Sequence, residues 1–285
     1  MRLTGIGFEE SVFVAATEGD EVRPLAEVGQ FWNDPYKWVT AGHVARCQPI
    51  ARHTVNIVPP ARPDARILCV GLNYAEHAAE GPYAVPDHPT IFGRWTASLA
   101  VSDHEVAVPV DEDGLDWEAE LLAVVGKRLS VADPVEAASA VFAYGCFNDI
   151  TARRAQKLTS QWTIGKNVDS SGPMSDLVTA EEVPDPTTGL RITARVNGEL
   201  TQDARTDQMI FPVPEVLAFV SRTLALRPGD MVAMGTPSGV GYARSPAWLL
   251  QPGDSVVVEI EQIGSVRSKV VGPKKPGIDF VTRMS

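Results

Sequence analysis

Three acidic residues in two apolar stretches are the strongest chemical signal in this chain. Glu118 and Glu120 alternate along the segment LDWEAELLAVVG, so a β-strand would direct both side chains to the same side. Asp149 follows a second apolar stretch, VFAYGCFND. Three carboxylates that converge at the edge of a sheet repel one another unless a cation lies between them. The pattern therefore predicts a divalent-metal enzyme.

Oxygen ligands alone favour a hard cation, and we expect Mg²⁺ or Mn²⁺ at these three residues. Mg²⁺ prefers six oxygens and keeps several waters, so three carboxylates leave about three positions for water or substrate. The alternative interpretation is that Glu118 and Glu120 form the polar face of a half-exposed strand. The apolar run that follows them favours burial on both faces, and hence the metal site.

A possible general base lies upstream of the acids. His77 and Glu80 are three residues apart in GLNYAEHAAEG, and on a helix such side chains meet, so Glu80 would orient the imidazole and increase its basicity. The alternative is a surface ion pair of small energetic value. Helix-breaking residues flank the segment and favour a short helix on a mobile lid over residues 74–90, with little apolar surface to anchor it. These residues are Gly71, Gly81, Pro82 and Pro86.

Composition limits the class of protein. With 285 residues and 44% hydrophobic content, the chain can form one large domain, or one large and one small domain. A net charge of -11 and a pI near 4.9 argue against nucleic acid or an anionic membrane as partners, and the basic pair Lys274-Lys275 near the end does not change this balance. No apolar run approaches the roughly 18 residues that a membrane helix needs.

Three cysteines without CxxC spacing argue against a disulfide framework or a zinc site. The N-terminus, MRLTGIGFEE, also lacks the features of a signal peptide. We therefore expect reduced thiols and a cytoplasmic location.

Proline-rich and turn-forming segments along the chain predict three parts. Residues 1–62 form a small β-rich domain that closes at a stiff proline segment, residues 63–272 form the catalytic domain, and residues 273–285 form a C-terminal tail. Within the second part we expect strands at 67–71 and at 191–196, and a type I′ turn at Asn197-Gly198 after the second of these. We expect two further strands, each directly after a PGD turn. Helical spacing appears in 135–144 and 213–224. The expected class is a β-rich α+β fold with a closed or partly rolled sheet.

Many stretches, in a fixed order, give the chain a resemblance to the fumarylacetoacetate hydrolase superfamily over about residues 66–271. They are VGLNYAEHAAE, PTIFGRW with TASL, LDWEAEL, FNDITARRAQ, QWTIGKNVD, VNGEL, MIFPVPE, LRPGDMVAMGTPSGVG and LQPGDSVVVEIEQIG. The resemblance implies a rolled, β-barrel-like catalytic domain. It also implies a metal on the three acids, a His77–Glu80 dyad on a lid that closes over substrate, and Lys166 reaching the substrate.

Further positions follow from the same resemblance. Arg153, Gln156 and Thr236 match family positions near the substrate, and the family's single-chain members are usually homodimers. One departure is visible: where many members have a lysine and prolines, this chain has Gly93-Arg94-Trp95. A bulky Trp95 beside Arg94 would narrow the pocket if it lined it, so the family's average substrate is not carried over to this chain.

The activity implied by the resemblance is hydrolysis of a carbon–carbon bond in a small 2-oxo acid such as an acylpyruvate or fumarylpyruvate. The metal would stabilise the enolate that forms as the bond breaks. His77 would deprotonate the attacking water, while Lys166 and the turn at Thr236 would hold the developing negative charge. Decarboxylation of oxaloacetate and isomerisation of a 2-hydroxy-dienoate need the same enolate and are the alternatives. A catalytically silent metal-binding protein is the alternative from another class.

Overall fold

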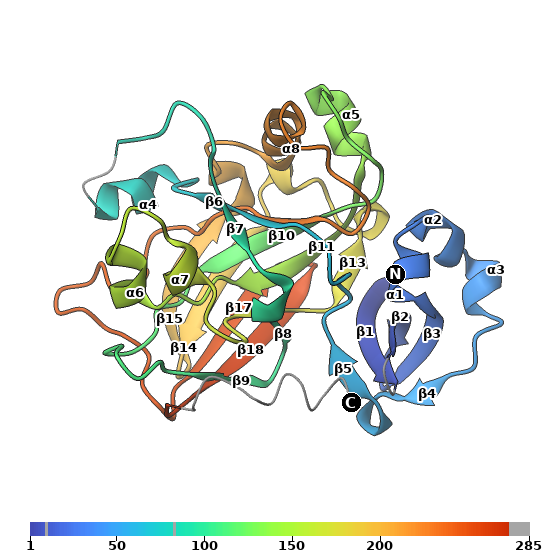
Figure 1. Ribbon diagram of the computed structural model, residues 1–285, viewed down its shortest axis with the longest axis horizontal. Helices are drawn as coiled ribbons and strands as arrows, with labels where there is room; N and C mark the ends of the chain where they lie inside the picture. The colour runs from blue at the N-terminus through green and yellow to red at the C-terminus, as the bar shows by residue number, and fades with distance from the viewer. Residues whose placement is uncertain (9–10, 82–83, 274–285) are drawn as a thin grey trace.

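A mixed sheet of 13 strands dominates the computed structural model, which describes residues 1–8, 11–81 and 84–273 (Figure 1). Pro82, Lys274-Lys275 and all but the first residue of the expected tail lie outside the described residues. In spatial order, the main path is β4 (Ile50–Ala51), β3 (Glu21–Glu27), β2 (Ser11–Glu18), β1 (Arg2–Phe8), β13 (Leu177–Thr179), β11 (Val141–Asn148), β10 (Ala119–Val125), β16 (Met231–Ala233), β6 (Ile67–Gly71) and β7 (Thr90–Arg94). Off this path lie β5 (Asn56–Val58), β8 (Leu99–Val101) and β12 (Gly172–Met174).

A second sheet has five strands. Their spatial order is β15 (Glu199–Arg205), β14 (Arg191–Val196), β17 (Ser255–Ile260), β18 (Gly264–Val271) and β9 (His104–Ala107). Within the described residues neither sheet closes on itself, because each path begins and ends on a different strand. The predicted β-rich α+β class is therefore confirmed, as a partly rolled and not a closed sheet.

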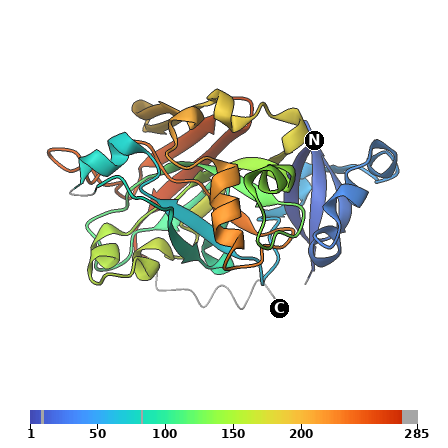
Figure 2. The same cartoon turned by 90° about the horizontal axis from the view of Figure 1, so that it is seen from above.

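Short helices lie outside the sheets. They are α1 (Val28–Phe31), α2 (Pro35–Trp38), α3 (Ala41–Val44), α4 (Ala75–Glu80), α5 (Pro134–Ser139), α6 (Arg153–Lys157), α7 (Thr163–Lys166) and α8 (Val213–Ser221). Single 3₁₀ turns are η1 (Arg52–Thr54), η2 (Thr96–Ser98), η3 (Ala180–Glu182), η4 (Pro186–Thr188) and η5 (Thr206–Gln208). Two views show α4, α6 and α7 gathered at the end of the molecule away from the N-terminal strands (Figures 1 and 2). In the part of the chain that the structure describes, no helix is long and apolar enough to cross a membrane.

Most strand predictions are confirmed, but one helix prediction is wrong. The positive φ values of Asn197 (50°) and Gly198 (87°) fit the expected type I′ turn between β14 and β15. The helix expected over 135–144 instead ends at Ser139, and β11 begins at Val141. Every residue of β11 is buried, so its apolar run fills a central strand, whereas the Asp133 capping box favours helix only at the start.

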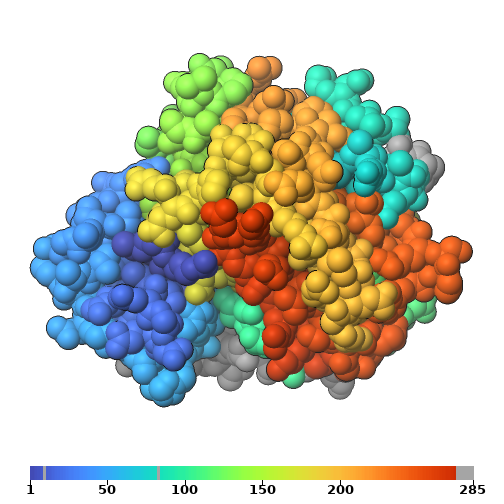
Figure 3. All heavy atoms as spheres, turned by 180° about the vertical axis from the view of Figure 1, so that it is seen from behind, coloured from blue at the N-terminus to red at the C-terminus, as the bar shows by residue number. Residues whose placement is uncertain are grey.

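The N-terminal strands share a core with the rest of the chain. β1 pairs with β13, and Phe31 and Trp32 pack edge-to-face against Phe142 of β11. The Trp32 indole also donates a hydrogen bond to the Pro60 carbonyl oxygen at 2.8 Å. Seen from behind, the N-terminal residues abut the larger part along a broad boundary (Figure 3). The division at residue 62 stays a prediction, because sheet and core both continue across it.

Candidate metal centre and catalytic pocket

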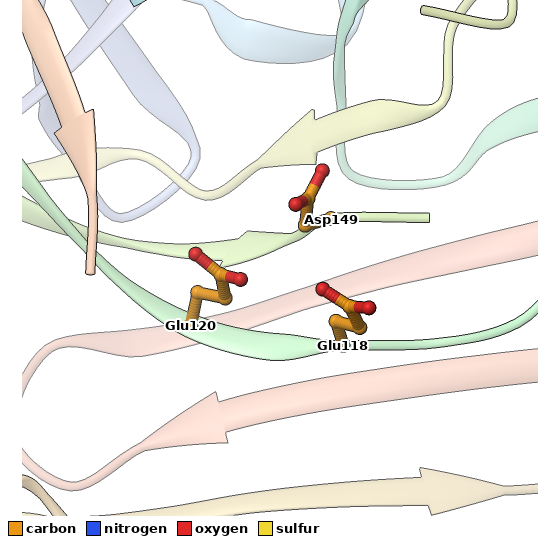
Figure 4. A group of neighbouring side chains, drawn as sticks. All are labelled: Glu118, Glu120 and Asp149. Carbon is orange, nitrogen blue, oxygen red and sulfur yellow. The ribbon is translucent and has the colours of Figure 1, made fainter. Parts of the chain in front are cut away.

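The three predicted acids converge where two central strands meet. Glu118 precedes β10 and Asp149 follows β11, its antiparallel neighbour, so the pairing brings the two residues together. The Asp149 amide donates to the Glu118 carbonyl oxygen at 2.9 Å, and Glu120 is the second residue of β10. One carboxylate oxygen from each acid lies within 4.8 Å of the other two (Figure 4). Glu118 and Glu120 extend from the same side of their strand toward Asp149, and all three residues are buried.

Electrostatics within this acid cluster (Glu118, Glu120 and Asp149) favour a cation. Burial, and then the charges of Asp149 and Glu118, raise the pKa of Glu120 well above its usual range. Burial also opposes ionisation of Glu118, but Lys166 and Arg153 outweigh it and lower its pKa to about 2. A divalent cation would relieve the repulsion, and three oxygen donors at this spacing fit a hard one.

Lys166 lies inside the cluster. It is the last residue of α7, and its Nζ donates to Glu118 Oε2 and to Asp149 Oδ2, both at 2.7 Å. The ammonium thus stands in for part of the positive charge that a bound cation would supply. Burial opposes its charge, but Asp149 and Glu118 raise its pKa. The structure therefore places Lys166 on two of the predicted ligands, and its proposed contact with substrate requires it to turn away from them.

Arg94 holds the other side of Asp149. It ends β7 and is buried, and its Nε donates to Asp149 Oδ1 at 2.5 Å. Its Nη1 donates to Ser171 Oγ at 3.0 Å and its Nη2 to the Ile150 carbonyl oxygen at 2.8 Å. Asp149 Oδ1 is therefore engaged with the guanidinium, while Oδ2 shares the Lys166 ammonium with Glu118.

Trp95 does not narrow the pocket. Its side chain is 56% exposed and is not among the residues that line the cavity beside the acids. Backbone alternation along β7 explains this, because Trp95 follows Arg94 and points to the opposite side. The aromatic residues on the cavity wall are instead Phe92, Trp162 and Tyr242.

The predicted dyad borders the same cavity, which has a volume of about 300 Å³. Its acidic wall is formed by Glu118 and Glu120, and the dyad residues His77 and Glu80 come from α4. His77 Nδ1 lies 2.8 Å from Glu80 Oε2, while Glu80 Oε1 accepts a hydrogen bond from the Gly239 amide at 2.7 Å. A carboxylate at Nδ1 favours the tautomer with the proton on that nitrogen, which leaves Nε2 as the basic atom.

The helix that carries the dyad is better anchored than expected. Tyr74 and Ala78 are buried, and Tyr74 forms a β-bridge with Met209. The segment therefore has an apolar inner side, contrary to the sequence-based expectation of little anchoring surface. Residues 82–83 of the predicted lid lie outside the described residues, and the motion of residues 74–90 stays a prediction.

The glycine-rich turn after β16 supplies backbone donors. Gly235 and Gly239 have φ values of +87° and +103°, a backbone conformation that residues with a side chain rarely adopt. The Gly235 amide donates to Glu120 Oε2 at 2.9 Å, so the turn fixes an acid of the cluster as well as the dyad. Thr236 lines the cavity, and its hydroxyl oxygen accepts a hydrogen bond from Gln202 Nε2 at 2.8 Å.

Arg153 and Gln156 both line the cavity from α6. Arg153 Nη2 lies 2.7 Å from Asp116 Oδ2 and 2.7 Å from Glu118 Oε1. Burial opposes its charge, but Asp116 and Glu118 outweigh it and raise its pKa. Sequence reasoning missed Asp116, although it stands two residues before Glu118 and continues the alternation of Glu118 and Glu120.

This chain belongs to the fumarylacetoacetate hydrolase family. Residues 66–271 match the family model described as fumarylacetoacetate (FAA) hydrolase C-terminal. An oxaloacetate tautomerase, FAHD2B, mitochondrial, from Bos taurus is 38% identical over 218 residues, which are 75% of this chain and 69% of the relative. The predicted family is therefore confirmed, and so is the prediction that the chain is an enzyme of this family. The expected cytoplasmic location stays a prediction, since that relative is mitochondrial.

Solved structures share the fold. A 2-hydroxyhepta-2,4-diene-1,7-dioate isomerase from Mycobacterium marinum has a TM-score of 0.78 and 28% identity, over 96% of this chain and all of the other. A fumarylpyruvate hydrolase from Pseudomonas aeruginosa, in complex with Mn²⁺ and pyruvate, has a TM-score of 0.67 and 31% identity, over 76% of this chain and 91% of the other. Similar chains therefore carry out different reactions. The expected homodimer stays a prediction.

Proposed function

We propose that this chain is a divalent-metal-dependent enzyme that moves a proton at the carbon next to the keto group of a 2-oxo acid, as a keto–enol tautomerase does. The observation that carries the proposal is the position of the His77–Glu80 pair, which borders the same cavity as Glu118 and Glu120. A base and a cation site on one cavity are what enolisation needs. The bovine relative, an oxaloacetate tautomerase, supports this reaction.

Glu118, Glu120 and Asp149 would hold the cation, because their oxygens lie close together and their charges repel one another without one. When bound, a divalent cation polarises the keto and carboxylate oxygens of a 2-oxo acid and stabilises the negative charge of its enolate. We propose Mg²⁺ or Mn²⁺, since all three donors are carboxylates. The Mn²⁺ in the Pseudomonas aeruginosa neighbour supports this choice.

The chain's own residues would then move and hold the proton. His77 Nε2 accepts the proton from the carbon next to the keto group, while Glu80 and the Gly239 amide keep the imidazole in that tautomer. Lys166 lines the cavity and would donate to the substrate oxygen that becomes negative, once its ammonium turns from the acids toward the cavity. Arg153, Gln156 and Thr236 line the remaining wall and would bind the substrate.

Hydrolysis of a carbon–carbon bond in an acylpyruvate or fumarylpyruvate is the second candidate. The specific observation in its favour is the Pseudomonas aeruginosa neighbour, a fumarylpyruvate hydrolase. In this reaction His77 would take a proton from a water that attacks the distal carbonyl, and the products would be pyruvate and a carboxylic acid. Isomerisation of a dienoate and decarboxylation of oxaloacetate use the same residues.

A substrate panel separates these reactions. Purified protein with Mg²⁺ or Mn²⁺ is mixed with oxaloacetate, acetylpyruvate or fumarylpyruvate, and loss of enol absorbance and formation of pyruvate are followed together. We expect rapid interconversion of keto and enol oxaloacetate without pyruvate. Pyruvate from the acylpyruvates would favour hydrolysis, and pyruvate from oxaloacetate would favour decarboxylation. No turnover of any of these acids would overturn the proposal.

A further inference from the structure

Lys157 is a cation at the cavity that pairs with no carboxylate among the described residues. Arg153 and Lys166 line the cavity and each lies 2.7 Å from carboxylate oxygens. Lys157 lines it as well, yet within residues 1–8, 11–81 and 84–273 it forms no ion pair with a carboxylate. It is exposed, so it stands at the solvent side of the cavity. A cation held there without an anion is a place where an anionic ligand can bind.

Lys157 is held in place by the ring of Tyr242. Its Nζ lies 3.7 Å from the ring centroid, and the guanidinium carbon of Arg153 lies 4.8 Å from the same centroid. Arg153 and Lys157 are four residues apart on α6, so their side chains are neighbours, with Cβ atoms about 5–6 Å apart on a helix. Two cations therefore share one aromatic ring and one wall of the cavity.

Repulsion between Arg153 and Lys157 affects the pKa of Lys157. Burial, and then the charge of Arg153, lower the pKa of Lys157. The carboxylates beside Arg153 do not remove this effect, because Arg153 already pairs with Asp116 and Glu118. A further negative charge between or beside the two would be stabilising.

We propose that Lys157 binds a second, distal carboxylate of the substrate, so that the enzyme prefers 2-oxo dicarboxylic acids to 2-oxo monocarboxylic acids. This rests on the proposed function, because one end of the substrate is assigned to the acid cluster. Arg153 contacts Glu118 of that cluster, and Lys157 lies one helical turn further along α6. The two ends of a short diacid can thus meet the cation site and the Lys157 ammonium. Ser160 lines the same cavity and offers a hydroxyl donor nearby, whereas the Thr159 hydroxyl already donates to the Gln161 carbonyl oxygen.

The test compares Lys157→Met with wild type on oxaloacetate, a diacid, and acetylpyruvate, a monoacid. We expect the preference for oxaloacetate in kcat/KM to fall by about 10- to 100-fold, the range for a hydrogen bond to a charged group. The loss should appear mainly in KM, because the distal carboxylate keeps its charge throughout the reaction. Lys157→Arg, which retains the charge, should restore most of the preference.

Lys127→Met is the matched control, because Lys127 also lies over a tyrosine ring, that of Tyr36, and does not line the cavity. An unchanged preference in Lys157→Met, with normal wild-type turnover, would overturn this inference alone. Absence of turnover of both acids by the metal-loaded wild type would overturn the proposed function, and this inference with it.

Discussion

Glu118 and Glu120 of the acid cluster border the same cavity as the His77–Glu80 pair, yet the acid cluster and the pair are carried by different elements. The acids stand at the junction of β10 and β11, which are hydrogen-bonded to further strands on both outer sides. The dyad stands on the six-residue helix α4, and its side chains are 13% and 22% exposed. A cation site on central strands is held in place before any ligand binds. For a base on a short helix, even one with buried Tyr74 and Ala78 on its inner side, we predict that its position adjusts more easily.

The two regions also differ in how their charges are balanced. Three buried or nearly buried cations surround the acids, and they are Arg94, Arg153 and Lys166. The dyad is fixed by one backbone amide, that of Gly239. We infer that holding the three acids together costs electrostatic free energy and that the cluster is rigid. The dyad carries a smaller electrostatic cost, and we predict that it moves more easily. The following substitutions and measurements test this contrast, beginning with the largest expected effect.

Glu120→Gln should remove one anionic ligand and reduce activity by at least about 10³-fold, because metal catalysis supplies several kcal/mol. Equilibrium metal binding should weaken in parallel. The metal-free variant should remain folded, since glutamine resembles the protonated Glu120 that burial favours. Calorimetric metal titration and thermal unfolding measure these effects. Undiminished activity after chelation and dialysis of the wild type would contradict the metal site.

His77→Ala should lower turnover by about 10²–10⁴-fold, the usual range for loss of a general base. Metal affinity should not change, because His77 is not a proposed ligand. Glu76→Ala is the matched control on the same helix, where Glu76 accepts a hydrogen bond from Ser238 outside the dyad. Steady-state kinetics and metal titration of both variants make the comparison. Weakened metal binding in His77→Ala would show that the two regions are not separable.

Arg94→Lys should weaken metal affinity by about 10- to 100-fold, as expected for a residue that orients a ligand. Lysine keeps the charge but cannot reproduce the forked contacts to Asp149, Ser171 and the Ile150 carbonyl. Metal titration checks the affinity, and saturating metal should recover most of the activity. An affinity equal to that of wild type would mean that Asp149 needs no such support.

Metal binding should release a proton and strengthen as pH rises. Because the pKa of Glu120 is raised, the metal-free protein retains a proton there at pH values where the unfolded chain has lost it. The cation needs the ionised form, so affinity should increase by up to about tenfold per pH unit until the pH exceeds that raised pKa. Calorimetry in buffers of different ionisation enthalpy measures the proton. Glu120→Gln should abolish its release, and an unchanged release would assign the proton to another group.

Hydrogen exchange should show the smallest effect, and it compares the two supports directly. We expect slow exchange in β10 and β11 with or without ligand, because these strands are central and buried. Oxalate, which chelates through two adjacent oxygens, should with metal slow exchange across residues 74–81. Full protection of α4 in the free enzyme would mean that the dyad is already fixed.

The sequence was most informative where a local pattern and a chemical requirement coincide. The period-two spacing of Glu118 and Glu120 in an apolar run predicted both the strand β10 and the convergence of the acids. The same rule extended by one step would have found Asp116. Local pattern misassigned residues 141–144 as helix, because burial on both faces of a central strand depends on neighbours that are distant in sequence.

The partners of the site could not be predicted in this way. Arg94 and Asp149 are 55 residues apart in sequence, and only the order of strands in the sheet brings them together. Likewise, the amides of Gly235 and Gly239 act as donors because of backbone conformation, which residue type alone does not reveal. The roles assigned to the site residues stay predictions that the experiments above can test.

Exchange of the C3 protons of oxaloacetate with deuterium, followed by NMR in deuterated buffer, tests the central claim most directly. With Mg²⁺ or Mn²⁺, the wild type should accelerate this exchange well above the rate without enzyme. Glu120→Gln and His77→Ala should each remove the acceleration, the first through loss of the cation and the second with the metal still bound. Acceleration that persists in His77→Ala, or in the chelated wild type, would contradict a base and a cation acting together on one substrate.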